Sequence, residues 1–451
     1  MTTPQTATLL AEVQALIRER EREGVRGLAE RVGPSEWADL VPMLEPSEVA
    51  VLFQWLPDEE ISEVLAELSP TDAAAILRTL TRAEAAVLLE EMDPDDATDV
   101  VEHLADDEAR EILVRMQPED AQELRELSQY APESAGGIMT PEFVAVTADA
   151  TAGQAIAAIR RLVDEAETVH YIYVVDASGG LRGVLSLYRL LLSPAETPVS
   201  ELMAPSTVRI RADADQEVAA RLLTDRNLLA IPVVDDADRL LGIITEDDVA
   251  DVLEAEATED IERLGGSEPL NAPYRSSGVL LLVRKRIVWL LLLFVAEAYT
   301  GTVLRDFQNE LSQVVALSFF IPLLIGTGGN MGSQTVTLVV RAMAIGEVAL
   351  GDIAWIVWKE LRVGLLLGAI MAAVAFGRAY LLGVGAQVGG VVALTILAIC
   401  LWSATVAAAL PLVLRAFRID PAVVSAPLIT TLVDGTGLII YFSIAKVMLS
   451  L

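Results

Sequence analysis

The chain falls into three regions that differ in how hydrophobic and polar residues alternate. Between residues 34 and 127, short apolar stretches such as "AAAILRTL" and "AAVLLEEM" follow acidic segments at intervals of about 12 residues. Between residues 138 and 255, β-branched apolar runs are separated by turn residues, and from residue 279 onward long apolar runs dominate. These spacings predict short packed helices, then alternating strands and helices, then helices long enough to cross a membrane.

The first region carries a repeated signal for helix starts. The segments "EPSE", "SPTD", "DPDD" and "QPED" place a proline and acidic residues directly before each apolar stretch. Proline suits the first turn of a helix, and carboxylates interact favourably with the positive end of the helix dipole. We therefore expect an all-α superhelical N-terminal domain over residues 1–130, in which each short helix buries one face. Helix capping and solvation account for most of its acidic residues.

The second region contains one longer unit twice. In the first copy "GIMTPEFVAV" precedes "IYVVDASGGLRGVLSL", and in the second "ELMAPSTVRI" precedes "IPVVDDADRLLGIITEDD". Each copy reads as a strand, a helix, two strands around a turn, and a further helix. This α/β pattern resembles a tandem pair of CBS modules, the first at residues 131–198 and the second at 199–252. The resemblance implies that the two modules associate and bind adenine nucleotides or divalent ions.

An acidic connecting helix is expected after the CBS pair, over residues 253–275. The segment "DDVADVLEAEATEDIERLGG" reads as one helix with densely spaced acidic residues. Taken alone, a run of charges like this one is typical of a solvated helix face. Its acidic residues include Asp248, Asp251, Glu256, Glu259 and Asp260.

The third region, residues 276–451, is expected to form a five-helix transmembrane domain, which makes the chain a multi-domain membrane protein. Each of its apolar runs exceeds the roughly 20 residues that a lipid bilayer requires. Basic residues precede the first run and flank the loops after the second and fourth, which predicts cytoplasmic N-terminal domains and a C-terminus outside. Five helices make a thin wall for a pore, which favours a homodimer with the path at its two-fold axis. The predicted spans are 279–303, 312–342, 352–381, 386–416 and 424–449.

Charge separates the membrane region from the rest of the chain. From Ser276 to the end there are 8 acidic and 11 basic residues, which leaves 57 acidic and 21 basic residues, a net charge of −36, in residues 1–275. Nucleic acid is excluded as a natural partner, because affinity for phosphates comes from Lys and Arg. Cations are the partners that such a charge attracts.

Asp434, in "LITTLVDGTGLIIYF", stands inside the last apolar run. A carboxylate near the centre of a membrane helix costs about 2.5–3.5 kcal/mol on insertion scales, so it should face water, a partner group or an ion. It could pair with a neighbouring helix, but the central parts of the predicted spans contain no Lys or Arg. We therefore favour an ion site. Oxygen ligands without nitrogen or sulfur select hard cations such as Mg²⁺ or Ca²⁺.

A glycine-rich stretch, "IGTGGNMGSQTVT", interrupts the second apolar run at residues 325–337. Its glycines permit either close packing of helices or a break in the helix. Polar backbone and amides at membrane depth are tolerated where they line a watery path, and Asp434 supplies a reason for such a path. We therefore predict that this stretch and the polar face around Asp434 line a pore. The predicted pore-lining residues are Asn330, Gln334, Thr430, Thr431 and Gly435.

The order of these parts resembles the MgtE family of magnesium channels and transporters over nearly the whole chain. The segments "PLLIGTGGNMGSQTVTLVVRA", "VLEAEATEDI" and "DPAVVSAPLITTLVDGTGLIIYF" carry the resemblance. It implies a homodimer whose pore is lined by the second and fifth membrane helices, with hydrated Mg²⁺ at Asp434. It also implies that cytosolic Mg²⁺ binds between the acidic domains and closes the pore. The implied binding residues are Asp95, Asp99, Asp215, Asp248, Asp251, Glu256, Glu259 and Asp260, with Asp420 at the inner end of the pore.

Two positions depart from the family pattern. Asn227 stands where a further Mg²⁺-binding acid is expected in the second CBS module. In the first module "SLYRL" replaces an Arg-Asp pair that the family pattern places near a nucleotide, which argues against ATP as a ligand.

These features together predict a homodimeric, Mg²⁺-selective channel of the bacterial inner membrane that cytosolic Mg²⁺ closes. One alternative is a transporter coupled to H⁺ or Na⁺, with Glu297 as a proton site. Another is a membrane-anchored nucleotide sensor. An enzyme is not expected, because the sequence shows no constellation of nucleophile, base and oxyanion donors.

Overall fold

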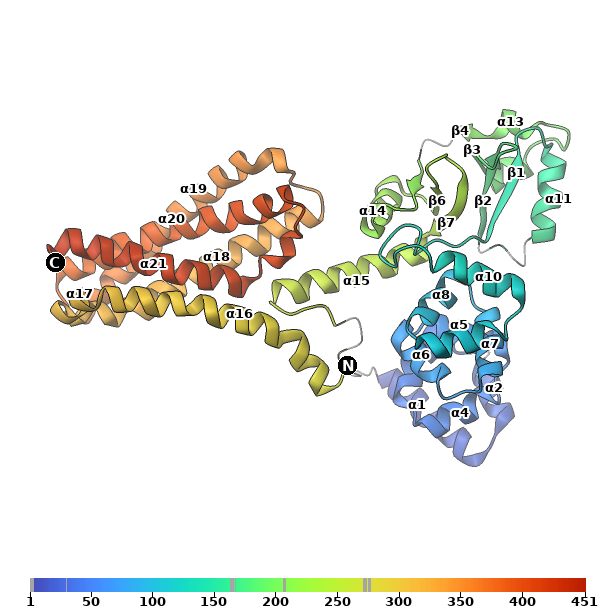
Figure 1. The fold of residues 1–451 in the computed structure, drawn as a ribbon, viewed down its shortest axis with the longest axis horizontal. Coiled ribbons are helices and arrows are strands. Elements are labelled where there is room, and N and C mark those ends of the chain that lie inside the picture. Colours follow the sequence, from blue (N-terminus) through green and yellow to red (C-terminus); the bar gives the residue numbers. More distant parts are fainter. Residues whose placement is uncertain are drawn as a thin grey trace. The chain divides into compact units, whose positions relative to one another are not determined.

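A computed structural model describes residues 4–29, 31–162, 166, 168–205, 208–270, 274 and 277–451. The chain divides into two compact units, the first ending at Ala255 and the second beginning at Glu256 (Figure 1). The first unit contains the helical N-terminal domain and the α/β domain, and the second contains the long apolar helices.

Short helices make up the N-terminal domain, as its repeated start signals predict. Prolines occupy the first turns of α4, α6, α8 and α10, and the side chains of Ser69 and Thr81 cap α6 and α7. Asp93 stands before α8 without a side-chain cap bond, so its carboxylate is not explained by capping. The helices are α1 (Pro4–Glu19), α2 (Arg22–Ala29), α3 (Pro34–Leu40), η1 (Val41–Met43), α4 (Pro46–Phe53), α5 (Asp58–Ala66), α6 (Pro70–Leu77), α7 (Arg82–Glu90), α8 (Pro94–Glu102), α9 (Asp106–Leu113) and α10 (Pro118–Leu127).

Helices two positions apart in this domain pack on one another. Contacts join α3 to α5, α5 to α7 and α7 to α9, and likewise α6 to α8 and α8 to α10. Leu65, Leu77 and Leu89 are almost completely buried in the continuous core that results. Each helix is too short to be stable alone, so its stability comes from burying this apolar face.

The α/β domain consists of two modules of the expected order. The first has β1 (Phe143–Thr147), α11 (Ala152–Leu162), β2 (Thr168–Val175), β3 (Leu181–Ser186) and α12 (Leu187–Leu191). After α13 (Val199–Leu202) and β4 (Ala204–Pro205), the second has β5 (Ile210–Arg211), α14 (Gln216–Arg226), β6 (Ala230–Val234), β7 (Leu240–Thr245) and α15 (Glu246–Leu264).

The two sheets have equivalent pairings and share a core. β1 is parallel to β2 and β2 antiparallel to β3, and β5, β6 and β7 repeat this arrangement. β4 extends the first sheet along β3. Tyr173 of β2 is buried with Val234 of β6 and Ile243 of β7, so apolar side chains of both modules form one cluster.

The connecting helix begins earlier and ends earlier than expected. α15 is continuous from Glu246 to Leu264, so residue 253, the predicted boundary, lies inside a helix. Asp248 therefore lies in the first turn of α15 rather than in a preceding module. Part of the predicted range, residues 271–273 and 275, lies outside the described residues.

Long helices form the second unit. Four segments of the described chain are long and apolar enough to cross a membrane, namely Val315–Ala344, Leu350–Leu381, Ala386–Ala416 and Ala426–Leu449. They coincide with the second to fifth predicted spans. The first predicted span forms α16 (Val279–Asp306), which is not among these four, so its crossing of the membrane stays a prediction. The remaining elements are α17 (Gln308–Gln313), η2 (Val315–Phe320), α18 (Ile321–Ala344), η3 (Leu350–Asp352), α19 (Ile353–Leu381), α20 (Ala386–Ala416), η4 (Pro421–Val423) and α21 (Ala426–Leu449).

The central helices of this unit are α18, α20 and α21, which all contact one another, while α19 packs on α20 and α16 on α21 (Figure 1). Residues such as Ile399, Val433 and Leu438 fill the core between them. Many large apolar side chains of α16 and α19 are exposed on the protein, as expected for surfaces that meet lipid or another chain.

Candidate functional site

Asp434 lies near the middle of α21, among polar and small residues. One of its oxygens, Oδ1, is buried and has no hydrogen-bond partner within the described residues. Thr430, one turn earlier on the same helix face, contacts Gly329 of α18, and the next residue, Gly435, meets Tyr299 of α16. Asp434 therefore lies on α21 between the face that contacts α18 and the face that contacts α16. A desolvated carboxylate oxygen with no partner is what an ion site requires and what a packing position avoids.

The glycine-rich stretch at residues 325–337 lies within α18. The helix is continuous, so the glycines do not break it. Gly328, Gly329 and Gly332 are buried and face side chains of α20 and α21 at distances that leave no room for a side chain. Close packing thus explains these three glycines, and this part of the pore-lining prediction is replaced by a packing role.

The opposite face of α18 is polar and exposed. Asn330 and Gln334 are both exposed on the protein. Together with Gly326 they are spaced four residues apart, so the three lie along one stripe of the helix. An amide stripe facing hydrocarbon would be costly, so this face must meet water or another protein surface. That placement is compatible with the pore-lining role expected for Asn330 and Gln334.

A second group of acids lies within the first unit, where α8 meets the start of α15. Asp99 and Asp248 are close enough to repel each other electrostatically. Burial raises the pKa of Asp99 to about 6, with a further contribution from Glu102, and burial likewise raises the pKa of Asp248 to about 6. Asp248 also accepts hydrogen bonds from the backbone and hydroxyl of Thr245, at 3.2 and 2.7 Å.

Further acids that sequence reasoning missed extend this group. The charge of Asp247 reaches Asp93 and that of Glu67 reaches Asp251, and in both cases burial together with the neighbouring charge raises the carboxyl pKa. Asp93 and Asp247 belong to the quoted segments "DPDD" and "TEDD", so their motifs were visible in the sequence. Glu67 could not be identified from the sequence, because only the fold brings this residue, which follows α5, near Asp251.

The helices α8 and α14 place two further predicted binding residues, Asp95 and Asp215, together with Asn227. Asp95 is buried, at 7% exposure, in the first turn of α8. Asp215 caps α14 by accepting a 2.8 Å hydrogen bond from the backbone N–H of Glu217. Asn227 ends α14 in a left-handed conformation, with φ of 49°, which Asn tolerates better than most residues and which explains it without an ion.

Arg263 joins two residues that were expected to bind Mg²⁺. Its guanidinium forms ion pairs with Glu259, one turn earlier on α15, and with Asp420, which precedes α21. The second oxygen of Asp420 accepts a 2.8 Å hydrogen bond from Ala422 N–H. The guanidinium of Arg263 thus lies between the carboxylates of Glu259 and Asp420 within the second unit. Glu256 and Asp260 lie on the same helix.

Within the described ranges, no group of three or more His, Cys, Asp or Glu side chains is arranged to hold a metal ion. Of the acids expected to bind Mg²⁺, Asp99 and Asp248 lie near each other, and the described residues form no compact cage of carboxylates. Since Mg²⁺ retains much of its water and is bound through one or two carboxylates, paired acids are compatible with it.

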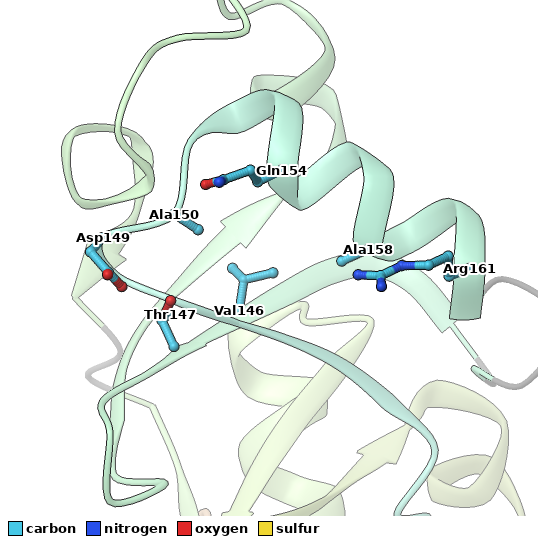
Figure 2. A pocket seen from close by; sticks show the side chains of 7 residues that line it. All are labelled: Val146, Thr147, Asp149, Ala150, Gln154, Ala158 and Arg161. Atoms are coloured by element: carbon cyan, nitrogen blue, oxygen red, sulfur yellow. The ribbon is translucent and has the colours of Figure 1, made fainter.

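One hollow in the α/β domain lies apart from these acids. It has a volume of about 490 Å³ and is lined by residues of β1, the following turn and α11 (Figure 2). Asp149 and Gln154 lie at one side of it and Arg161 at the other. It contains none of the predicted site residues.

Comparison with known proteins agrees with the order of these parts. The model of an MgtE intracellular N domain matches residues 32–133, and the CBS domain model matches residues 135–196 and 199–255. The MgtE model, described as a divalent cation transporter, matches residues 321–444. The magnesium transporter MgtE of Thermus thermophilus is 43% identical over 327 residues, which cover 72% of each protein. The chain belongs to the MgtE family of magnesium transporters.

Other MgtE relatives extend this comparison. The magnesium transporter MgtE of Bacillus subtilis is 34% identical over 71% of this chain and 70% of its own length. A crystal structure of the cytosolic domain of the Mg²⁺ channel MgtE in complex with ATP aligns with 54% of this chain and 99% of that chain, with 36% identity and a TM-score of 0.52. The resemblance read from the motifs is confirmed, and membership in a transporter family agrees with the expectation that the chain is not an enzyme.

Proposed function

We propose that this MgtE protein is a homodimeric, Mg²⁺-selective channel of the bacterial inner membrane, closed by cytosolic Mg²⁺. Its acidic domains lie in the cytoplasm, its five membrane helices include α16, and its C-terminus lies outside. Two magnesium transporters are 43% and 34% identical to this chain over 72% and 70% of their own length, which supports Mg²⁺ as the ion that it carries.

The observation that carries the proposal is the carboxylate of Asp434. It lies in a helix that is long and apolar enough to cross a membrane, and within the described residues one of its oxygens is buried without a hydrogen-bond partner and it has no ion pair. Such a group is costly in a membrane unless an ion or water compensates it. Mg²⁺ that enters with part of its water shell would supply both the positive charge and the water molecules.

Closure by Mg²⁺ is supported by the paired acids of the first unit. Asp99 and Asp248 repel each other, and the same holds for Asp251 with Glu67. Divalent cations between them would replace this repulsion with attraction and favour one arrangement of α8 and α15. Since α15 continues to Leu264 in the second unit, it is the element through which the ions would act on the pore.

Coupled transport remains the alternative for the membrane unit, with Glu297 as the proton site. A nucleotide sensor is supported by one observation, the ATP complex of the related cytosolic domain. That complex favours ATP as a ligand of the CBS pair in addition to Mg²⁺ transport, although "SLYRL" departs from the family pattern.

The test is Mg²⁺ flux through proteoliposomes that contain the Asp434→Asn variant. This change removes the charge and keeps the shape, so we expect flux to be abolished while the dimer remains assembled in size-exclusion chromatography. Asp306→Asn, at the exposed outer end of α16, is the control and should leave flux unchanged. Undiminished flux in Asp434→Asn would remove Asp434 from the pore. Proton movement in step with Mg²⁺ would favour the coupled transporter.

A further inference from the structure

Glu297 is an acid within the long apolar helix α16. It follows the apolar run "VWLLLLFVA", is exposed on the protein, and has no ion pair within the described residues. Its charge interacts with that of Asp434. An exposed carboxylate at this place in an apolar helix is costly, so its surface must face water, an ion or a second chain rather than hydrocarbon.

Three contacts fix the level of α16 against α21. Trp289 Nε1 donates a 3.2 Å hydrogen bond to Ser425 Oγ. Further along both helices Tyr299 meets Gly435, and still further Phe307 and Phe442 stack with their ring centroids 4.8 Å apart.

The numbers of the paired residues differ by 135 or 136 at all three places, so the two helices run parallel and in step. This register places Glu297 at the level of Val433, one residue from Asp434. Because both helices rise by the same amount per residue, the two carboxylates occupy the same depth.

A buried hydroxyl lies beside these acids. Thr300 is one turn beyond Glu297 on the same face of α16 and is only 5% exposed. Its Oγ1 has no hydrogen-bond partner within the described residues, and it lies 3.3 Å from the point where a Cβ on Gly435 would be. Thr300 Oγ1 therefore points at α21 beside Asp434, whose Oδ1 is also buried and has no hydrogen-bond partner in the described part of the chain.

We propose that Glu297 supplies a second carboxylate to the ion site of Asp434, so that one face shared by α16 and α21 holds a hydrated divalent cation. Two carboxylates at one depth repel each other, and a cation with two positive charges neutralises both of them within one chain. Thr300 offers an acceptor for a water molecule in the shell of the ion. A monovalent cation would leave one negative charge uncompensated, so Glu297 favours divalent ions. This inference rests on the proposed role of Asp434 in the pore.

The experiment compares Glu297→Gln with the parent protein in proteoliposomes, with Mg²⁺ flux and its block by cobalt hexammine measured over a range of concentrations. We expect the Mg²⁺ concentration for half-maximal flux to rise about tenfold, which corresponds to about 1.4 kcal/mol of lost binding. The concentration of cobalt hexammine for half-maximal block should rise by a similar factor, because the hydrated-ion mimic meets the same charges. Flux of Na⁺ relative to Mg²⁺ should increase.

Two matched variants complete the design. Glu297→Asp keeps the charge and should retain Mg²⁺ affinity much closer to that of the parent. Asp306→Asn, nine residues and about 13 Å further along α16, should leave affinity and block unchanged. Because Glu297→Asp shortens the side chain and keeps the carboxylate, parent-like affinity in this variant attributes the loss in Glu297→Gln to the missing charge.

Flux abolished in Asp434→Asn, together with parent-like affinity, block and Na⁺ flux in Glu297→Gln, would overturn this inference and leave the proposed function intact. The same result would follow if Glu297 only shared a proton with Asp434, because glutamine mimics the protonated acid. Undiminished flux in Asp434→Asn would instead overturn the proposed function.

Discussion

Asp99 of α8 and Asp248 of α15 lie close together, and burial disfavours the ionised form of both carboxyl groups. Their pKa values are raised to about 6 from a reference near 3.9 in an unfolded chain. At neutral pH both are ionised against this preference, with the charges of Glu102, Asp247 and Asp251 nearby. The contact between the helical domain and α15 is therefore under electrostatic stress that protons or cations relieve.

Acidification should stabilise the folded first unit when Mg²⁺ is absent. Because the pKa of each acid is higher in the folded than in the unfolded protein, the folded state binds more protons between about pH 4 and pH 6, and stability falls as pH rises through this window. We expect the melting temperature of a fragment ending near Gly265, measured with a chelator, to be at least about 2–4 °C higher at pH 5 than at pH 7.5.

Two comparisons identify the groups responsible for this pH dependence. Millimolar Mg²⁺ should reduce the difference between pH 5 and pH 7.5, because the ion removes the same repulsion that protons remove. The double variant Asp99→Asn/Asp248→Asn should also reduce it. A pH dependence equal in the variant and the parent would show that other acids determine it.

At the scale of elements, α18 packs through the glycines of its buried face. A Cβ on Gly332 would overlap Ile429 of α21 and would lie 2.8 Å from Ser403 Oγ of α20. Ser403 Oγ in turn donates a 2.7 Å hydrogen bond to the carbonyl oxygen of Gly328. Gly332 is thus at a place where three helices meet without room for another atom.

Gly332→Ala should destabilise the membrane unit by about 1–3 kcal/mol, the usual cost of inserting atoms into a packed core. Gly326→Ala is the matched control, because a Cβ at Gly326 meets nothing within 4 Å. Thermal denaturation of the detergent-solubilised full chain, followed by size-exclusion chromatography, should show a lower melting temperature for Gly332→Ala alone. Equal melting temperatures of the two variants would contradict the packing role of this face.

The elements were predictable from sequence, because their signals are local. Prolines with following acids marked the starts of α6 and α8, and apolar runs marked α18 to α21, with Asp434 as the one carboxylate of the last run. Relations between distant segments were not predictable. The register of α16 on α21 depends on contacts such as Trp289 with Ser425, and the pairing of Arg263 with Asp420 joins residues far apart in the sequence.

The glycine-rich stretch shows why a correct motif gave a partly wrong interpretation. Its composition allowed both a pore lining and a packing face, and a helix presents both at once. Gly328 and Gly332 lie on the buried face of α18, while Asn330 and Gln334 lie on the exposed face. Composition alone does not separate faces unless the helix is known to be continuous.

For the whole molecule, the dominant quantity is the net charge of −36 in residues 1–275. The proposed dimer would bring two such regions together, and charges within a Debye length of about 8 Å repel through weak screening. Moving an equilibrium between two states from 1:99 to 99:1 takes about 5.5 kcal/mol of differential binding. Several weak Mg²⁺ sites can share this amount, which also makes the response steep in Mg²⁺ concentration.

The cytoplasmic region should therefore become compact when Mg²⁺ binds. We expect a fragment ending near Gly265 to show a smaller radius of gyration in X-ray scattering and slower cleavage by protease as Mg²⁺ rises from micromolar to millimolar. K⁺ at equal ionic strength should do much less, because it screens charges without bridging them.

Replacing Asp248 and Asp251 by Asn should weaken the Mg²⁺-dependent compaction. The same change in the full chain should leave a channel that conducts at high cytosolic Mg²⁺. Identical scattering profiles with and without Mg²⁺ would refute the electrostatic gate and leave the role of Asp434 untouched, since the gate and the ion path lie in different parts of the chain.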